Sequence, residues 1–269
     1  MGSGIALCAA QNGFETVLFD TNRNVVDRAL ENINKTLDAL VSKNKLTPED
    51  KNAILTRMSF TENINDCVAP LIIEAIIEKV EIKTTLFNQL AALNDSNSIF
   101  ATNTSSLSVN LIQKNINHPE RVAGMHFFNP AQIMKLVEVV KAEQTSDATV
   151  DAIMDVCRRL KKTPVLCIDA PGFIVNRVAR HYYLEAMRIA EKEIAGFEAI
   201  DDIMEASGFK MGPFRLMDLI GMDINMAVST SLYEAFDQEP RFEPSPIQIK
   251  KVKDGELGKK TGKGFYSYI

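Results

Sequence analysis

The chain has 269 residues, of which 46% are hydrophobic and 24% are charged, and its formal net charge is −5. This balance excludes an intrinsically disordered protein, and the length predicts two domains, each with its own core. The negative charge argues against nucleic acid as a partner, because such binding depends on clustered Lys and Arg. We find no signal peptide and no run of about 18 apolar residues, so we expect no membrane partner.

The cysteine pattern indicates a reducing compartment. None of the four cysteines has CxxC spacing, and each lies in an apolar run: Cys8, Cys67, Cys157 and Cys167. Buried reduced thiols have this pattern, whereas a structural metal site does not. We therefore expect a cytoplasmic protein without a bound metal.

Short apolar runs alternate with helical patterns through the first 170 residues. In chain order these are ETVLFD, a helix over about 24–45, APLIIEA, a helix over about 80–93, SIFATN, RVAGMHFF, KLVEVV, one more helix and TPVLCID. Strands that alternate with helices predict a mainly parallel sheet with helices on both faces. We predict that residues 1–170 form a doubly wound, Rossmann-type dinucleotide-binding domain.

The pattern changes to helices after Ala170, with a long helix predicted from Gly172 to about Ala195. We therefore predict that residues 171–269 form a helical domain for substrate binding and dimerisation. Residues 214–236 hold more apolar side chains than one small domain needs, and this favours a homodimer through the helical domain.

The first twenty residues, which include GSGIALCAAQNGFETVLFD, are typical of a helix, a loop, a strand and a terminal acid. Gly2 matches the third glycine of a GxGxxG phosphate-binding turn, so we expect that the first strand and the first two glycines are missing from this sequence. Asp20 stands where a ribose-binding carboxylate follows the second strand. On local pattern alone it fits a helix N-cap equally well.

Polar residues follow the predicted strands repeatedly, namely Glu78, Asn103, Ser105 and His126. Ligands of open α/β sheets bind outside the carboxyl ends of the strands, so these side chains are expected to share a cleft with Asp20. Any single one could instead be an incidental polar residue of a loop.

His126 is the leading catalytic candidate, because imidazole takes and returns a proton near neutral pH. The alternative is a hydrogen-bonded histidine of the core. Glu138 favours catalysis, since a carboxylate within the apolar strand KLVEVV needs a partner, and adjacent strands could bring it to His126. Asn176 lies in the first turn of the long helix, where it could reach the cleft or make an interdomain hydrogen bond.

Six segments in this order and spacing resemble the 3-hydroxyacyl-CoA dehydrogenases, most of all the bacterial short-chain enzymes, over nearly the whole chain: NTSSL, MHFFNP, MKLVEVV, APGFIVNR, MGPF and LGKKTGKGFY. The resemblance implies that His126 is a general base and that Glu138 orients it. It implies that Ser105 and Asn176 hydrogen-bond around the 3-oxygen and the thioester of the substrate.

The same resemblance assigns the cofactor and the coenzyme contacts. Gly2 and Asp20 would bind the adenosine half of NAD, and the nicotinamide half would be lined by Glu78, Lys83 and Asn103. Thr36 and Lys43, two turns apart on one helix, would contact the CoA nucleotide and lie in a basic region that attracts an anionic substrate.

The implied reaction interconverts an (S)-3-hydroxyacyl-CoA, expected to be 3-hydroxybutyryl-CoA, and the 3-ketoacyl-CoA with NAD(H). Asp20 favours NAD over NADP because a carboxylate repels a 2′-phosphate, although Arg23 lies nearby. The incomplete nucleotide site keeps one alternative open, a non-catalytic or cofactor-deficient relative on the same fold. A second alternative is an enzyme that acts on another 3-hydroxy acid without CoA.

Overall fold

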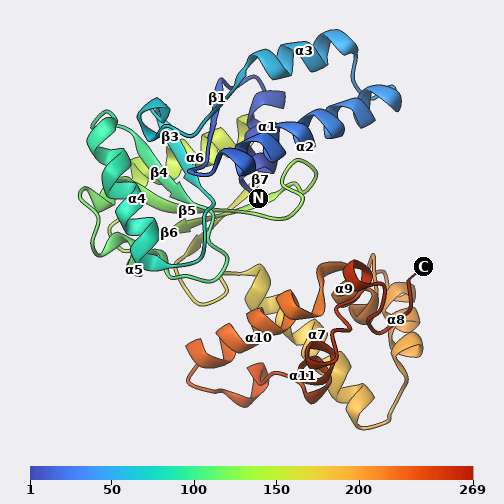
Figure 1. Cartoon of the computed structure of the whole chain (residues 1–269). Helices are drawn as coiled ribbons and strands as arrows, with labels where there is room; N and C mark the ends of the chain where they lie inside the picture. The colour runs from blue at the N-terminus through green and yellow to red at the C-terminus, as the bar shows by residue number, and fades with distance from the viewer. Residues whose placement is uncertain (269) are drawn as a thin grey trace. The chain divides into compact units, whose positions relative to one another are not determined.

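The computed structural model describes residues 1–268, which divide into two compact units (Figure 1). Unit 1 runs from Met1 to Asp169, and unit 2 begins at Ala170. Each unit has its own hydrophobic core.

Unit 1 consists of strands and helices in alternation. Its strands are β1 (Thr16–Phe19), β2 (Met58–Thr61), β3 (Leu71–Glu74), β4 (Ile99–Thr102), β5 (Val122–Phe127), β6 (Leu136–Lys141) and β7 (Thr163–Ile168). Its helices are α1 (Gly2–Gln11), α2 (Arg23–Ser42), α3 (Pro48–Thr56), α4 (Val80–Leu93), α5 (Val109–Gln113) and α6 (Asp147–Arg159).

The sheet of unit 1 is in two parts. One part has the strand order β3-β4-β5-β6-β7, and the other is the parallel pair β1-β2. Every pairing in the larger part is parallel except that of β5 with β6. Within residues 1–268 no strand joins β1 to β3. The mainly parallel sheet with flanking helices confirms the fold class predicted from the sequence.

Helices cover both faces of the larger sheet, and strand alternation decides which side chains meet which helices. Ala123 and Met125 of β5 pack in a cluster with residues of α1 and α6, whereas Val122 packs with residues of α4 and α5. Figure 1 shows α4 and α6 on opposite sides of this sheet. His126, four residues after Val122, therefore lies on the α4 side.

Capping residues and apolar stripes explain where the helices form. The Asn22 side chain accepts a hydrogen bond from the backbone N–H of Asn24 and begins α2. The buried residues of α2 recur every three or four positions along one face: Val26, Ala29, Ile33 and Leu37. Ser146 caps α6 in the same way through the N–H of Thr149.

Unit 2 is helical, as predicted. Its helices are α7 (Val175–Glu191), α8 (Phe197–Ala206), α9 (Pro213–Ile220), α10 (Met222–Ala235) and α11 (Pro246–Lys253). The C-terminal FYSY segment makes only isolated bridges, such as Lys263 with Ser267, and forms no strand within the described residues.

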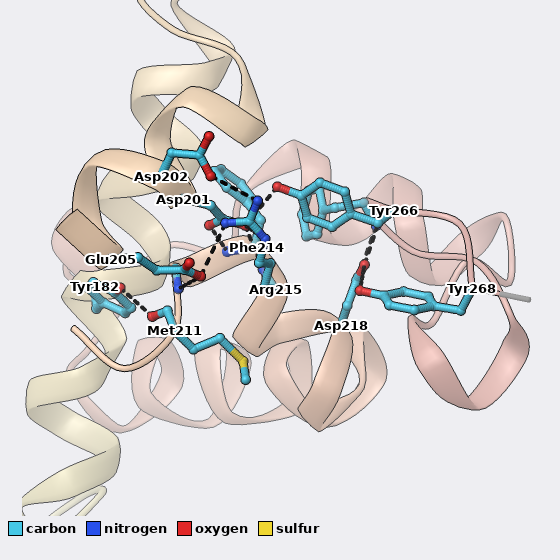
Figure 2. A network of polar contacts seen from close by, with 12 residues as sticks. Tyr182, Asp201, Asp202, Glu205, Met211, Phe214, Arg215, Asp218, Tyr266 and Tyr268 are labelled. Carbon is cyan, nitrogen blue, oxygen red and sulfur yellow. Dashed lines mark hydrogen bonds and ion pairs between the residues drawn. The ribbon is translucent and has the colours of Figure 1, made fainter. Parts of the chain in front are cut away.

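Two buried carboxylates fasten the C-terminal segment of unit 2 (Figure 2). Asp201 accepts hydrogen bonds from the N–H groups of Phe214 and Arg215 at the start of α9 and from the Tyr266 hydroxyl. Asp218 accepts hydrogen bonds from the N–H groups of Phe265 and Tyr266 and from the Tyr268 hydroxyl. Burial, and the hydrogen bond with Asp201, raise the pKa of Tyr266 well above its usual range. These carboxylates thus satisfy backbone donors that packing would otherwise leave buried and unpaired.

Candidate active site

The two catalytic candidates of the first unit's strands, His126 and Glu138, are both buried, and the structure brings them together. They lie directly opposite each other in the antiparallel pairing of β5 and β6. The His126 Nδ1 atom is 2.7 Å from Glu138 Oε2, and the two side chains are 8% and 1% exposed. A hydrogen bond of this length fixes the imidazole ring in one orientation.

Close packing of the two strands positions this pair. A Cβ atom on Gly124 would lie 2.7 Å from the Cβ of Val140, so only glycine permits the observed approach of β5 to β6. The ring of Phe128 lies beside the imidazole, with 4.6 Å between the ring centroids. The pair is therefore rigidly supported by its own strands.

Cys167 on β7 is near Glu138 but is not a competing nucleophile. Burial, with a contribution from the negative charges of Glu138 and Asp169, raises the pKa of this thiol to about 11. Cys167 consequently stays protonated at neutral pH.

Asn103 joins the ends of two strands next to this pair. Its side-chain oxygen accepts a hydrogen bond of 2.8 Å from the backbone N–H of Phe127, the residue after His126. Its own N–H donates to the carbonyl of Glu74 at the end of β3. Asn103 thus links β3, β4 and β5 at their carboxyl ends. The cleft is predicted from the sequence at this edge of the sheet.

Glu78, Lys83 and Ser105 form a second connected group. The Lys83 ammonium lies 3.1 Å from Glu78 Oε2, and Glu78 Oε1 accepts a 3.0 Å hydrogen bond from the N–H of Ser105. All three residues are predicted from the sequence. Glu74, whose buried carboxylate is 2.6 Å from the same ammonium, is not. Glu74 could have been found in the sequence, because it is the one acid in the apolar run LIIEA, as Glu138 is in KLVEVV.

Asp20 is at the carboxyl end of β1, half-buried, and its Oδ1 accepts a hydrogen bond from the N–H of Asn22. Asn22, not Asp20, is the N-cap of α2, so the helix-cap alternative for Asp20 was wrong. Arg23 pairs with Asp27 at 3.0 Å. The basic side chain that could favour NADP is therefore engaged on its own helix.

These residues fit a dinucleotide. Gly2 begins α1, and a Cβ atom on it would lie 3.8 Å from the Cβ of Ala75, directly after β3. The N-terminal end of α1 is thus next to a strand end, where a helix N-terminus attracts phosphate. The acids Asp20 and Glu78 can accept hydrogen bonds from ribose hydroxyls.

Thr36 of α2 lines a hollow of unit 1, together with the first turn of α1 and residues 129–132. Lys43 is exposed at the C-terminal end of the same helix and does not line this hollow. Of the two predicted CoA contacts, Thr36 thus lines the same hollow as the segment that follows His126.

Asn176 is the second residue of α7 and belongs to unit 2. The other two histidines lack a buried acid partner. His118 is exposed and lies 3.3 Å from Glu120, and His181 lies beside the ring of Phe242, with its pKa lowered by burial and by nearby arginines such as Arg241.

Residues 1–268 contain neither a metal-binding cluster of side chains nor a membrane-spanning helix. No group of three or more His, Cys, Asp or Glu side chains there could hold a metal ion. Nor does any helix of that region combine the length and the apolar character that a membrane span requires.

Comparisons with known proteins agree over the whole chain. Residues 1–170 match the family model of the 3-hydroxyacyl-CoA dehydrogenase NAD binding domain, and residues 172–268 match the model of the C-terminal domain of the same dehydrogenases. A 3-hydroxyadipyl-CoA dehydrogenase from Escherichia coli is 45% identical over all of this chain, which spans 57% of that protein's length.

Two further relatives extend this likeness. A probable 3-hydroxybutyryl-CoA dehydrogenase from Deinococcus radiodurans is 39% identical, with all of this chain and 96% of that protein aligned. The crystal structure of a 3-hydroxybutyryl-CoA dehydrogenase from Escherichia coli superposes with a TM-score of 0.96 at 45% identity and covers all of this chain and 57% of that one.

Proposed function

Since the chain belongs to the 3-hydroxyacyl-CoA dehydrogenase family, we propose that it interconverts short-chain (S)-3-hydroxyacyl-CoA and 3-ketoacyl-CoA with NAD(H). The expected pair is 3-hydroxybutyryl-CoA and acetoacetyl-CoA. The observation that carries this proposal is the buried contact of 2.7 Å between His126 and Glu138 at the end of β5.

The contact determines which atom of the imidazole acts. The Nδ1–H group donates a hydrogen bond to the Glu138 carboxylate and keeps its proton, so the neutral ring has its lone pair on Nε2. Nε2 then takes the proton of the substrate 3-hydroxyl, and Glu138 stabilises the imidazolium that forms. Bound NAD supplies the acceptor for the hydride that leaves C3.

Other residues bind and orient the reactants. Ser105, two residues after Asn103, is proposed to hydrogen-bond the substrate oxygens together with Asn176. Asp20 holds the adenosine ribose, with Gly2 at the phosphates, and the nicotinamide half is lined by Glu78, Lys83 and Asn103. For the CoA nucleotide we propose Thr36 and Lys43.

We also propose a homodimer through unit 2 and a cytoplasmic location. Unit 2 exposes several large apolar side chains that a second copy could cover: Ile194, Ile203, Phe209, Leu219 and Ile224. All four cysteines are free thiols, which a reducing compartment maintains.

The competing proposal is a non-catalytic relative that retains the fold. In that case the His126 and Glu138 pair would only support β5 and β6. The acyl group of the substrate is a separate question, because one Escherichia coli match is named for a hydroxyadipyl group and the other for a hydroxybutyryl group. The assay therefore compares acetoacetyl-CoA with 3-oxoadipyl-CoA as substrates.

The experiment measures NADH oxidation with each 3-ketoacyl-CoA for the parent and for His126→Ala, with thermal unfolding measured alongside. The variant should lose turnover by a factor of about 10² or more and keep a cooperative unfolding transition. His118→Ala, at an exposed histidine, is the matched control and should retain parental turnover. A folded His126→Ala variant with near-parental turnover would favour the non-catalytic relative.

A further inference from the structure

The buried carboxylate of Glu74 lies in unit 1 at the end of β3. Its side chain is 0% exposed, and that of its partner Lys83 is 1% exposed. Two fully buried opposite charges remain in a protein interior only if they are paired and hydrogen-bonded. Glu74 is therefore the internal counter-ion of Lys83.

Glu74 is itself fixed by three donors. Its Oε1 accepts a hydrogen bond from the N–H of Ile76 at 2.6 Å and is also 2.6 Å from the Lys83 ammonium. Its Oε2 accepts a hydrogen bond from the hydroxyl of Thr102 at 2.8 Å. The carboxylate thus has a single position, set by β3, by β4 and by the first turn of α4.

The contacts continue from Lys83 to the edge of the cleft. The ammonium is 3.1 Å from Oε2 of Glu78, which is 38% exposed, and the other oxygen of Glu78 accepts the N–H of Ser105 at 3.0 Å. We define the series Glu74, Lys83, Glu78 and the Ser105 N–H as the relay. It runs from a buried acid through two residues proposed for the cofactor to one residue proposed for the substrate.

We propose that Glu74 is a positioning residue, which holds Lys83 and Glu78 and through them the backbone of Ser105, so that one buried acid sets both halves of the cleft. The structure supports this role because the carboxylate of Glu74 contacts Lys83, Lys83 contacts Glu78, and Glu78 accepts the Ser105 N–H. Without Glu74, the Lys83 ammonium keeps Glu78 as its one charged partner among residues 1–268. Glu78 would then shift toward Lys83 and release the Ser105 N–H.

The kinetic part of the test rests on the proposed function, whereas the structural part does not. Hydrogen exchange of the Ser105 amide is measured in the parent, in Glu74→Gln, in Thr102→Val and in Glu81→Gln. Glu81 lies in the first turn of α4 and is exposed, so it is the matched control for loss of one negative charge.

We expect Ser105 exchange to rise about tenfold in Glu74→Gln, because a buried ion pair is broken, and about threefold in Thr102→Val, which loses one hydrogen bond. Amides of β6 should not change. If Glu74→Gln does not fold, the Ser105 exchange rate in Thr102→Val tests the proposal instead. Unchanged Ser105 exchange, or an equal rise in β6, would overturn the proposal.

Steady-state kinetics separate positioning from a merely structural role. A positioning role predicts that the KM values for NADH and for acetoacetyl-CoA both rise about tenfold in Glu74→Gln, with partial recovery in Glu74→Asp. A structural role predicts that only kcat falls, in proportion to the folded fraction, and that result contradicts the proposal. A parent without turnover would contradict the proposed function instead, and the exchange experiment would still test the relay.

Discussion

The two units both bury carboxylates, but these carboxylates have different partners. In unit 2, Asp201 and Asp218 accept hydrogen bonds from backbone N–H groups and from tyrosine hydroxyls (Figure 2). In unit 1, Glu138 contacts an imidazole and Glu74 contacts an ammonium group.

The partners, and not the burial, separate a structural acid from one that can serve chemistry. A backbone N–H does not titrate, and burial together with the hydrogen bonds to these acids raises the pKa of Tyr266 and Tyr268, so both hydroxyls stay protonated at neutral pH. Asp201 and Asp218 therefore stabilise the segments that they join. An imidazole or an ammonium changes its charge or its position, so the acid beside it can control a reactive group. We therefore expect stability losses when the buried carboxylates of unit 2 are replaced and activity losses when those of unit 1 are replaced.

The largest stability loss is expected for Asp218→Ala. It leaves the N–H groups of Phe265 and Tyr266 and the Tyr268 hydroxyl without their acceptor, at a cost of about 3 kcal/mol or more in the free energy of unfolding. The control Asp223→Ala, which removes an exposed pair with Lys260, should cost less than about 1 kcal/mol. Urea unfolding measures both, and equal losses would contradict a structural role for Asp218.

A smaller effect is expected at Asp20, which is only half-buried and shares one oxygen with a backbone N–H. Asp20→Ser should weaken NAD binding and narrow the preference for NAD over NADP about tenfold, because the charge that repels a 2′-phosphate is lost. Titration with both cofactors measures this preference, and Glu15→Ser, at an exposed acid before β1, is the control. An unchanged preference would remove Asp20 from the ribose site.

Much of unit 1 could be predicted from the sequence because its signals are local. Apolar runs such as VLF and LIIE formed the expected strands, and the placement of His126 and Glu138 on consecutive strands implied that they meet. The segments α3 and β2 were missed. The N-cap Thr47, with Pro48 and two acids after it, was a usable helix signal, whereas the four residues of β2 have no continuous apolar run.

The contacts that were missed join distant parts of the chain. Asp218 contacts Phe265 at a separation of 47 residues, and no local sequence pattern predicts this contact. Glu74 meets Thr102 at a separation of 28 residues, across neighbouring strands whose register only the folded sheet defines. Sequence patterns predicted which residues could react, but not which buried groups hold them.

The most direct test of the central claim, that His126 and Glu138 act as a catalytic pair, is a double-mutant cycle of turnover. The single variants His126→Ala and Glu138→Gln should each lose a large factor, about 10² or more for His126→Ala, with unfolding temperatures near that of the parent. The double variant should cost little more than His126→Ala alone, because an orienting carboxylate has no role once its imidazole is gone. Additive losses in turnover, or losses that only follow the unfolded fraction, would contradict the account.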